Sequence, residues 1–205
     1  SLSHHIGKTC DAQSAAIKNI DAWYSELSNN GLDAIVINTS GCGTTVKDYH
    51  HMFQGTEHEE KAKVIAGLTK DISEILVELE LPDRAENDIN VAYHSACSLQ
   101  HGQQISNSPK DMLKKCGYKI SEPKNSHLCC GSAGTYNLLQ PKISQELKNR
   151  KIQSLEAKKP DIIAAGNLGC MMQISSSTNI PVVHTVELID WATGGPKPNK
   201  LNDKH

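Results

Sequence analysis

Four cysteines offer the most specific chemistry in this sequence. Cys129 and Cys130 are adjacent in the small-residue stretch Leu128–Gly134, with Cys97 upstream and Cys170 downstream. Thiolates are soft ligands that select zinc, copper(I) and iron–sulfur clusters. We therefore predict that these four side chains are the ligands of one metal centre.

The adjacent pair of cysteines requires an unusual backbone. Neighbouring residues on a regular strand point to opposite faces, so both sulfurs can serve one centre only if the chain is kinked. Gly131 and Gly134 provide the conformational freedom for that kink, and Gly169 allows a close approach beside Cys170. Two cysteines that were adjacent only by chance would not need these glycines beside them.

The other cysteines and the histidines give weaker signals. Cys10 and Cys116 are expected to act as small apolar residues in helices. Cys42 stands in a glycine-rich turn that suits a metal ligand, although its companion cysteines are missing. It remains a candidate metal ligand. Three histidines are expected to be ordinary core or surface side chains, with a supporting role beside the metal as the alternative: His94, His101 and His127.

Helical periodicity alternates with short apolar runs along the chain, which predicts an α/β fold with short, mostly parallel sheets flanked by helices. Buried strands are expected at 33–38, 89–94, 118–123, 161–165 and 181–184. Helices are expected at 15–27, 44–53, 64–79, 109–116, 136–158 (with a jog at Pro141), 171–176 and 186–192, and a turn at 39–43. The four cysteines then follow strand ends, where open α/β sheets form their sites.

Two segments of the chain match each other when their glycine–cysteine turns are superposed. They read DAIVINTSGCGTT and DIIAAGNLGCMMQ. We expect two repeats: residues 1–84, with a helical connector, form the last part of the first, and residues 85–205 form a complete second. If three residues are skipped in the alignment of the two repeats, Ser1 stands opposite Ser132. The first repeat would then be truncated at its N-terminus, and Cys42 would be its last remaining ligand.

The composition excludes several classes of protein. The 205 residues carry a net charge of −2, which gives no electrostatic footprint for nucleic acid or an anionic membrane. No apolar run approaches the roughly 20 residues that span a bilayer. Seven cysteines are too few, and their odd number fits poorly, for a disulfide-stapled secreted protein. We expect a cytoplasmic protein that contacts the inner membrane only through a complex.

The cysteine pattern resembles a known family. Cys97, then Cys129-Cys130-Gly131, then Cys170 is similar to the cysteine-rich CCG domain of the heterodisulfide reductases and their relatives. The stretches CCGSAGTYNLL, NLGCMMQI and PVVHTVELIDWATGG most resemble the C-terminal half of glycolate oxidase iron–sulfur subunits. SGCGTTVKDYHHMF resembles the end of the first CCG repeat in those subunits.

The resemblance implies a non-catalytic electron-transfer subunit of an oxidoreductase complex. Such a subunit binds an iron–sulfur cluster, expected here to be [4Fe–4S], and accepts electrons from FAD-containing subunits that oxidise glycolate to glyoxylate. Related subunits serve lactate utilisation and anaerobic glycerol-3-phosphate dehydrogenase complexes. They usually begin with a ferredoxin-like module carrying two CxxCxxCxxxCP runs, and this module is missing from the chain.

The sequence departs from the heterodisulfide reductase pattern at one position in each repeat. The last element of that pattern is CxxC, which can give five cysteines to a noncubane cluster, but Asn167 and Thr39 replace the earlier cysteine here. Four thiolates suffice for a cubane [4Fe–4S] cluster or for tetrahedral zinc. The alternatives are therefore a structural zinc domain that docks partner subunits, and a Cys129–Cys130 pair that exchanges disulfides.

Overall fold

The computed structural model describes residues 2–79, 81–82 and 84–202, and it confirms the α/β class with parallel sheets. The chain divides into two compact units between Ile72 and Ser73. The expected boundary lay further along, at 84–85. The junction falls in the helix α6 (Ile72–Glu78), and Leu76 on this helix packs against a core of the second unit. Among the described residues, no helix has both the length and the apolar composition to cross a membrane.

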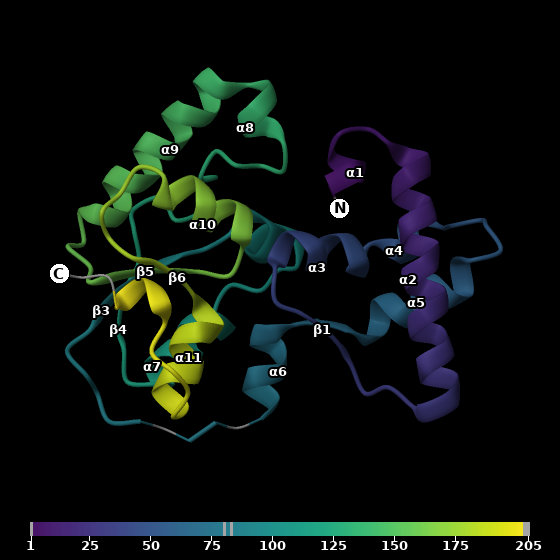
Figure 1. The fold of residues 1–205 in the computed structure, drawn as a ribbon, viewed down its shortest axis with the longest axis horizontal. Helices are drawn as coiled ribbons and strands as arrows, with labels where there is room; N and C mark the ends of the chain where they lie inside the picture. The colour runs from purple at the N-terminus through teal and green to yellow at the C-terminus, as the bar shows by residue number, and fades with distance from the viewer. Residues whose placement is uncertain (1, 80, 83, 203–205) are drawn as a thin grey trace. The chain divides into compact units, whose positions relative to one another are not determined.

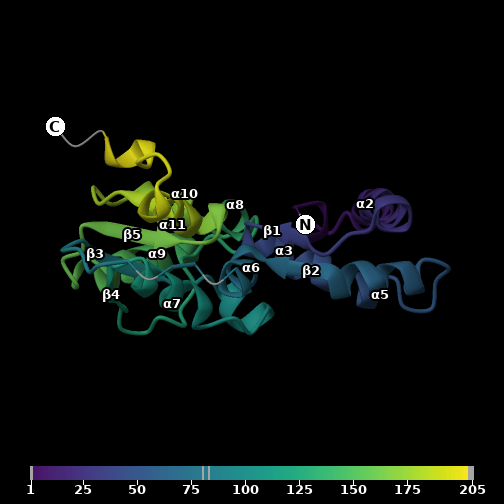
Figure 2. The same cartoon turned by 90° about the horizontal axis from the view of Figure 1, so that it is seen from below.

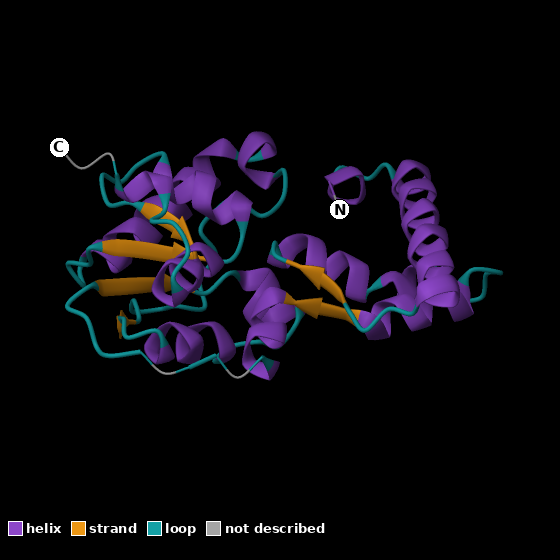
Figure 3. Cartoon of the chain, turned by 60° about the horizontal axis from the view of Figure 1, so that its bottom comes forward, coloured by secondary structure: helices purple, strands orange, loops and turns teal. Residues whose placement is uncertain are grey.

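The first unit contains a two-stranded parallel sheet, drawn as a separate pair of arrows in Figure 3. Its elements are α1 (Leu2–His5), α2 (Thr9–Asn30), β1 (Ile35–Ile37), α3 (Ser40–Lys47), α4 (Tyr49–Met52), α5 (Glu59–Leu68) and β2 (Thr69–Asp71). Ile35 pairs with Thr69 in the register of β1 and β2. The core of this unit includes Ile20 and Ile65, which are both fully buried.

Two predictions for the first unit are wrong. The helix expected at 64–79 is interrupted by β2, because Thr69 is extended and its hydroxyl caps α5 by donating to the Ile65 carbonyl at 2.8 Å. The turn expected at 39–43 is instead the start of α3. Thr39 is the extended N-cap residue, and its carbonyl accepts from the backbone nitrogen of Cys42 at 2.9 Å. Cys42 therefore lies in the first turn of a helix.

The second unit contains a four-stranded parallel sheet in the order β4-β3-β5-β6, and the expected strands and helices are confirmed. Its elements are α6 (Ile72–Glu78), β3 (Asn90–His94), a short π-helical turn η1 (Ser98–Gly102), α7 (Ser108–Lys115), β4 (Lys119–Ser121), α8 (Tyr136–Leu139), α9 (Pro141–Glu156), β5 (Ile162–Ala165), α10 (Leu168–Ser175), β6 (Val182–His184), α11 (Thr185–Thr193) and η2 (Asn199–Leu201). The expected jog before Pro141 separates α8 from α9.

Alternation along the central strands gives this sheet two buried faces. On β3, Val91 and Tyr93 belong to the core beneath α7 and α11, whereas Ala92 belongs to the core beneath α9 and α10. Figure 1 shows α9 and α10 on one side of the strands and α7 and α11 on the other, and Figure 2, turned by 90°, shows β4, β3 and β5 in this order across the sheet.

The strand order contains one point where the winding of the chain reverses. After β3 the chain moves outward to β4, then crosses back to β5 on the other side of β3. Ligand sites of open α/β sheets form at such points, outside the carboxyl ends of the strands. The fold therefore has a natural site between the ends of β3 and β5.

Candidate metal centre

The four predicted cysteines meet at the point where the winding reverses. Cys97 follows β3, Cys129 and Cys130 lie in the loop between β4 and α8, and Cys170 lies in the first turn of α10 after β5. Their thiols neighbour one another in a series that runs from Cys97 through the adjacent pair to Cys170. Cys130 and Cys170 are buried, and the other two are half-buried. We call these four residues the thiol cluster.

The kink predicted for the adjacent pair is confirmed. Gly131 has a φ of +92° and Gly134 a φ of +66°, which are left-handed conformations that favour glycine. The Ser144 hydroxyl on α9 donates to the Gly131 carbonyl at 2.7 Å and accepts from the Gln173 amide on α10 at 2.9 Å. The Gly131 backbone nitrogen donates to the Cys129 sulfur at 3.3 Å. Two helices thus hold the loop that carries the thiols.

A helix cap explains the residue that replaces the expected extra cysteine. Asn167 is the N-cap of α10, and its side-chain oxygen accepts from the Cys170 backbone nitrogen at 3.1 Å. A Cβ on Gly169 would lie 2.9 Å from the Ser132 hydroxyl, so the expected close approach is also confirmed. The cap holds Cys170 at a helix N-terminus, whose partial positive charge favours a thiolate.

Interactions between neighbouring thiols divide the four cysteines into two types. Cys130 and Cys97 lower the pKa of Cys129 to about 2. Cys130 lowers the pKa of Cys170 to about 5, against the effect of burial, and the neighbouring His94 adds to this lowering. The same interactions, together with burial, raise the pKa of Cys97 and of Cys130. The cluster therefore favours two thiolates, the form of cysteine that binds metals.

His94 differs most from its expected role. It is 1% exposed at the end of β3, and neither ring nitrogen has a hydrogen-bond partner in the part of the chain that the structure describes. Donor atoms of His94, Cys130 and Cys170 all lie within 4.8 Å of one another. The prediction of an ordinary, satisfied histidine is wrong here, because only the pairing of β3 with β5 brings the ring beside the thiols. Its place at the end of a buried strand was the available signal.

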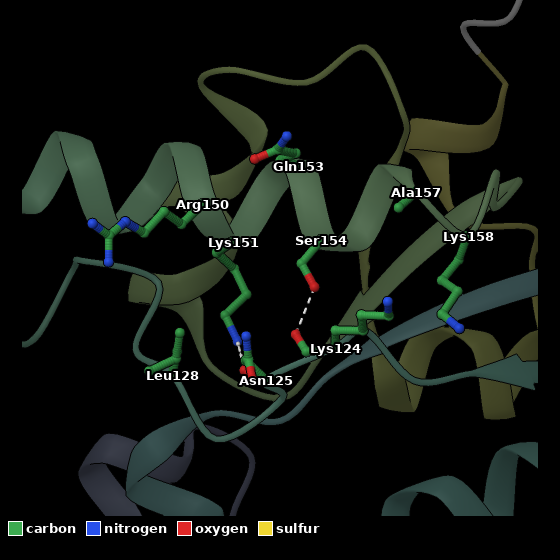
Figure 4. Close-up of a pocket in the computed structure, with 9 residues that line it drawn as sticks. All are labelled: Lys124, Asn125, Leu128, Arg150, Lys151, Gln153, Ser154, Ala157 and Lys158. Atoms are coloured by element: carbon green, nitrogen blue, oxygen red, sulfur yellow. Dashed lines mark hydrogen bonds between the residues drawn. The ribbon is translucent and has the colours of Figure 1, made fainter.

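A buried lysine lies on the other side of the thiol loop. Lys151 on α9 is 2% exposed, and its ammonium donates to the carbonyls of Asn125 and Ser126 at 3.4 and 3.1 Å. Burial lowers the pKa of Lys151, and the four thiols oppose that effect. Figure 4 shows its side chain reaching toward Asn125 in a groove of about 600 Å³. The groove is lined by Lys124, Asn125, Leu128, Arg150, Lys151, Gln153, Ser154, Ala157 and Lys158.

The remaining candidates lie outside the cluster. Cys116 is buried in the core on the opposite face of the sheet, as expected for a small apolar residue. Cys10 lies on α2 but is exposed, so the expectation of an apolar role is wrong for it. His101 and His127 are surface residues, as expected. Cys42 is exposed in the first unit, and its metal role stays a prediction.

Comparison with known proteins agrees with the resemblance drawn from the motifs. Residues 91–175 match the family described as a cysteine-rich domain, CCG. The chain is 34% identical over 193 residues to the glycolate oxidase iron-sulfur subunit of Escherichia coli (strain K12), covering 93% of this chain and 47% of the relative. It is 29% identical over 205 residues to the probable glycolate oxidase iron-sulfur subunit of Bacillus subtilis (strain 168), covering 94% and 45%.

A second group of relatives consists of lactate utilization proteins. Lactate utilization protein A of Anoxybacillus flavithermus (strain DSM 21510 / WK1) is 28% identical over 165 residues, which is 76% of this chain and 69% of the relative. The chain spans about half the length of the two glycolate oxidase subunits. The thiol cluster lies within residues 91–175, the segment that matches the cysteine-rich CCG domain.

Proposed function

We propose that this chain is part of an iron–sulfur electron-transfer subunit of an oxidoreductase complex. The observation that carries the proposal is the gathering of four thiols, two of them favouring the thiolate form, at one end of a parallel sheet. The relatives, which are named as iron-sulfur subunits, support it.

The proposed donor of electrons is an FAD-containing subunit that oxidises glycolate, or a similar 2-hydroxy acid, to its 2-oxo acid. The names of the relatives support glycolate first and lactate second. The chain itself would not bind the substrate. The proposed location is the cytoplasm, with any contact to the inner membrane made through the complex.

The donor set fits an iron–sulfur cluster. Cys97, Cys129, Cys130 and Cys170 would hold it, and we favour the [4Fe–4S] type because four cysteine thiolates are its usual ligands. When bound, such a cluster accepts and passes on single electrons. The protein holds the thiol loop against two helices and keeps the Lys151 ammonium nearby, where its charge offsets that of an anionic centre. Cys42 would belong to a second site in the first repeat.

Anaerobic purification of the full-length protein tests this proposal. We expect brown protein that contains iron and acid-labile sulfide in equal amounts and changes its EPR spectrum on reduction with dithionite. Colourless protein with one zinc per chain would refute it.

That second outcome would support a structural zinc site that docks partner subunits. The observation favouring zinc is the trio of His94, Cys130 and Cys170, because zinc sites commonly combine imidazole and thiolate ligands. Removal of zinc with a chelator should then unfold the second unit without any change in redox behaviour.

A further inference from the structure

A buried imidazole with two unsatisfied nitrogens requires a physical explanation. His94 is 1% exposed, and within the described residues neither of its ring nitrogens has a hydrogen-bond partner. A buried polar group without a partner destabilises the folded state. A ligand that binds the ring would remove the cost.

The position of the ring points to a metal as that ligand. Along β3, alternation puts His94 on the same face as Ala92, which belongs to the core that contains Cys130 and Cys170. The donor atoms of these three side chains lie within 4.8 Å of one another. Metal–nitrogen and metal–thiolate bonds of about 2.0–2.3 Å put the ring nitrogen within reach of the centre that these two thiols would hold.

We propose that His94 is a direct nitrogen ligand of the metal centre, which therefore has mixed sulfur and nitrogen ligation. One ring nitrogen of His94 would take the coordination position of one of its two cysteine neighbours, Cys130 or Cys170, so that four protein donors hold the centre. In an iron–sulfur cluster, an imidazole in place of a thiolate removes a negative charge and raises the reduction potential of the iron that it binds. The inference rests on a metal at this site, but it holds for iron and for zinc.

The decisive measurement is pulsed EPR of the reduced full-length protein prepared with ¹⁵N-labelled histidine. We expect a strong nitrogen coupling that changes with the isotope and disappears in His94→Ala. His101→Ala is the matched control, because His101 is exposed and lies close to Cys97 in the sequence, and it should keep the coupling. A coupling that survives in His94→Ala, or a wild-type spectrum without a histidine nitrogen, would overturn the proposal.

A second variant guards against misfolding of His94→Ala. His94→Cys offers a thiolate in the same place, so it should retain the wild-type iron content and shift the reduction potential to more negative values. An unchanged potential with full iron content would contradict direct ligation. Circular dichroism of each variant reports whether the fold is kept.

The failure of this inference can be distinguished from the failure of the iron–sulfur proposal. Iron and sulfide analysis of the wild-type protein decides the type of centre without reference to His94. If the metal is zinc, X-ray absorption at the zinc edge should contain imidazole scattering in the wild type and lose it in His94→Ala. Wild-type protein that binds neither metal after anaerobic reconstitution would overturn both proposals.

Discussion

The substitution Gly131→Ala tests whether the kink after the adjacent cysteines is what holds the metal centre. Gly131 has a φ of +92°, and a Cβ there would overlap the backbone carbonyl oxygen of Ser144 and lie 3.1 Å from its carbon. The left-handed backbone costs an alanine about 1–2 kcal/mol. Overpacking against a helix backbone adds about 1–3 kcal/mol. The free energy of unfolding should fall by about 2–5 kcal/mol, a large share of the roughly 5–15 kcal/mol that stabilises a typical domain.

The metal content should fall with the stability, because relief of the overlap moves the loop away from α9 and α10. The assay is urea unfolding followed by circular dichroism, together with metal analysis of the anaerobically purified full-length protein. A Gly131→Ala protein with wild-type stability and full metal content would refute this account of the loop.

Two other glycines provide matched controls. Gly117 also has a positive φ, +87°, and a Cβ there would overlap the backbone of Ala85, but this glycine precedes β4 and follows α7 on the opposite face of the sheet. Gly117→Ala should therefore be destabilised to a similar extent and still bind metal. Gly166, beside the helix cap, has open space around its Cα, and Gly166→Ala should change the stability by less than about 1 kcal/mol. Equal metal loss in Gly117→Ala would show that general destabilisation explains the result.

Three further predictions follow from the site and its core. Cys170→Ser should abolish metal binding, because a hydroxyl is a poor substitute for a buried thiolate. Cys10→Ser should retain the metal. Metal analysis compares the two variants, and metal loss in Cys10→Ser would contradict the proposed ligands. Lys151→Met should make the reduction potential of the centre more negative, since it removes a buried cation while keeping the packed aliphatic stem. Lys124→Met, on the exposed rim of the groove, should leave the potential unchanged. A redox titration compares the two variants, and equal potentials would count against the charge effect. Burial raises the pKa of Tyr118 from 10.0 to about 12. The contribution of this side chain to stability is therefore complete below about pH 10 and is lost as the pH rises through 12. Urea unfolding should show a flatter alkaline decline of stability in Tyr118→Phe than in the wild type, and an identical decline would refute the assignment.

The adjacent cysteines and their glycines could be recognised without the structure. A pair of neighbouring thiols serves one centre only on a kinked backbone, and the glycines that permit the kink stand directly after the pair. The ends of the strands were predictable for the same kind of reason, since short apolar runs followed by glycine or a capping residue leave little choice of boundary. Local chemistry was sufficient for these features.

Helix boundaries and one strand could not be predicted in the same way. Thr69–Asp71 has the composition of a helix continuation, and it forms a strand because β1 needs a partner for its backbone groups. The turn predicted at 39–43 is the first turn of a helix, in which the Thr39 carbonyl accepts from the Cys42 backbone nitrogen. In both cases the competing states are similar in local preference, and contacts within the first unit decide between them.

The sequence by itself therefore determined the soft-ligand chemistry and the α/β class, and it identified four cysteines in the segments that follow strands. Only the tertiary structure decided which other side chains share the site with them. His94 and Lys151 are close to the thiols because β3 pairs with β5 and α9 packs over that face, and these contacts join residues that are far apart along the chain. The periodicity of one segment carries no information on the register of its neighbours, so the polar environment of the centre appears only when the sheet is assembled.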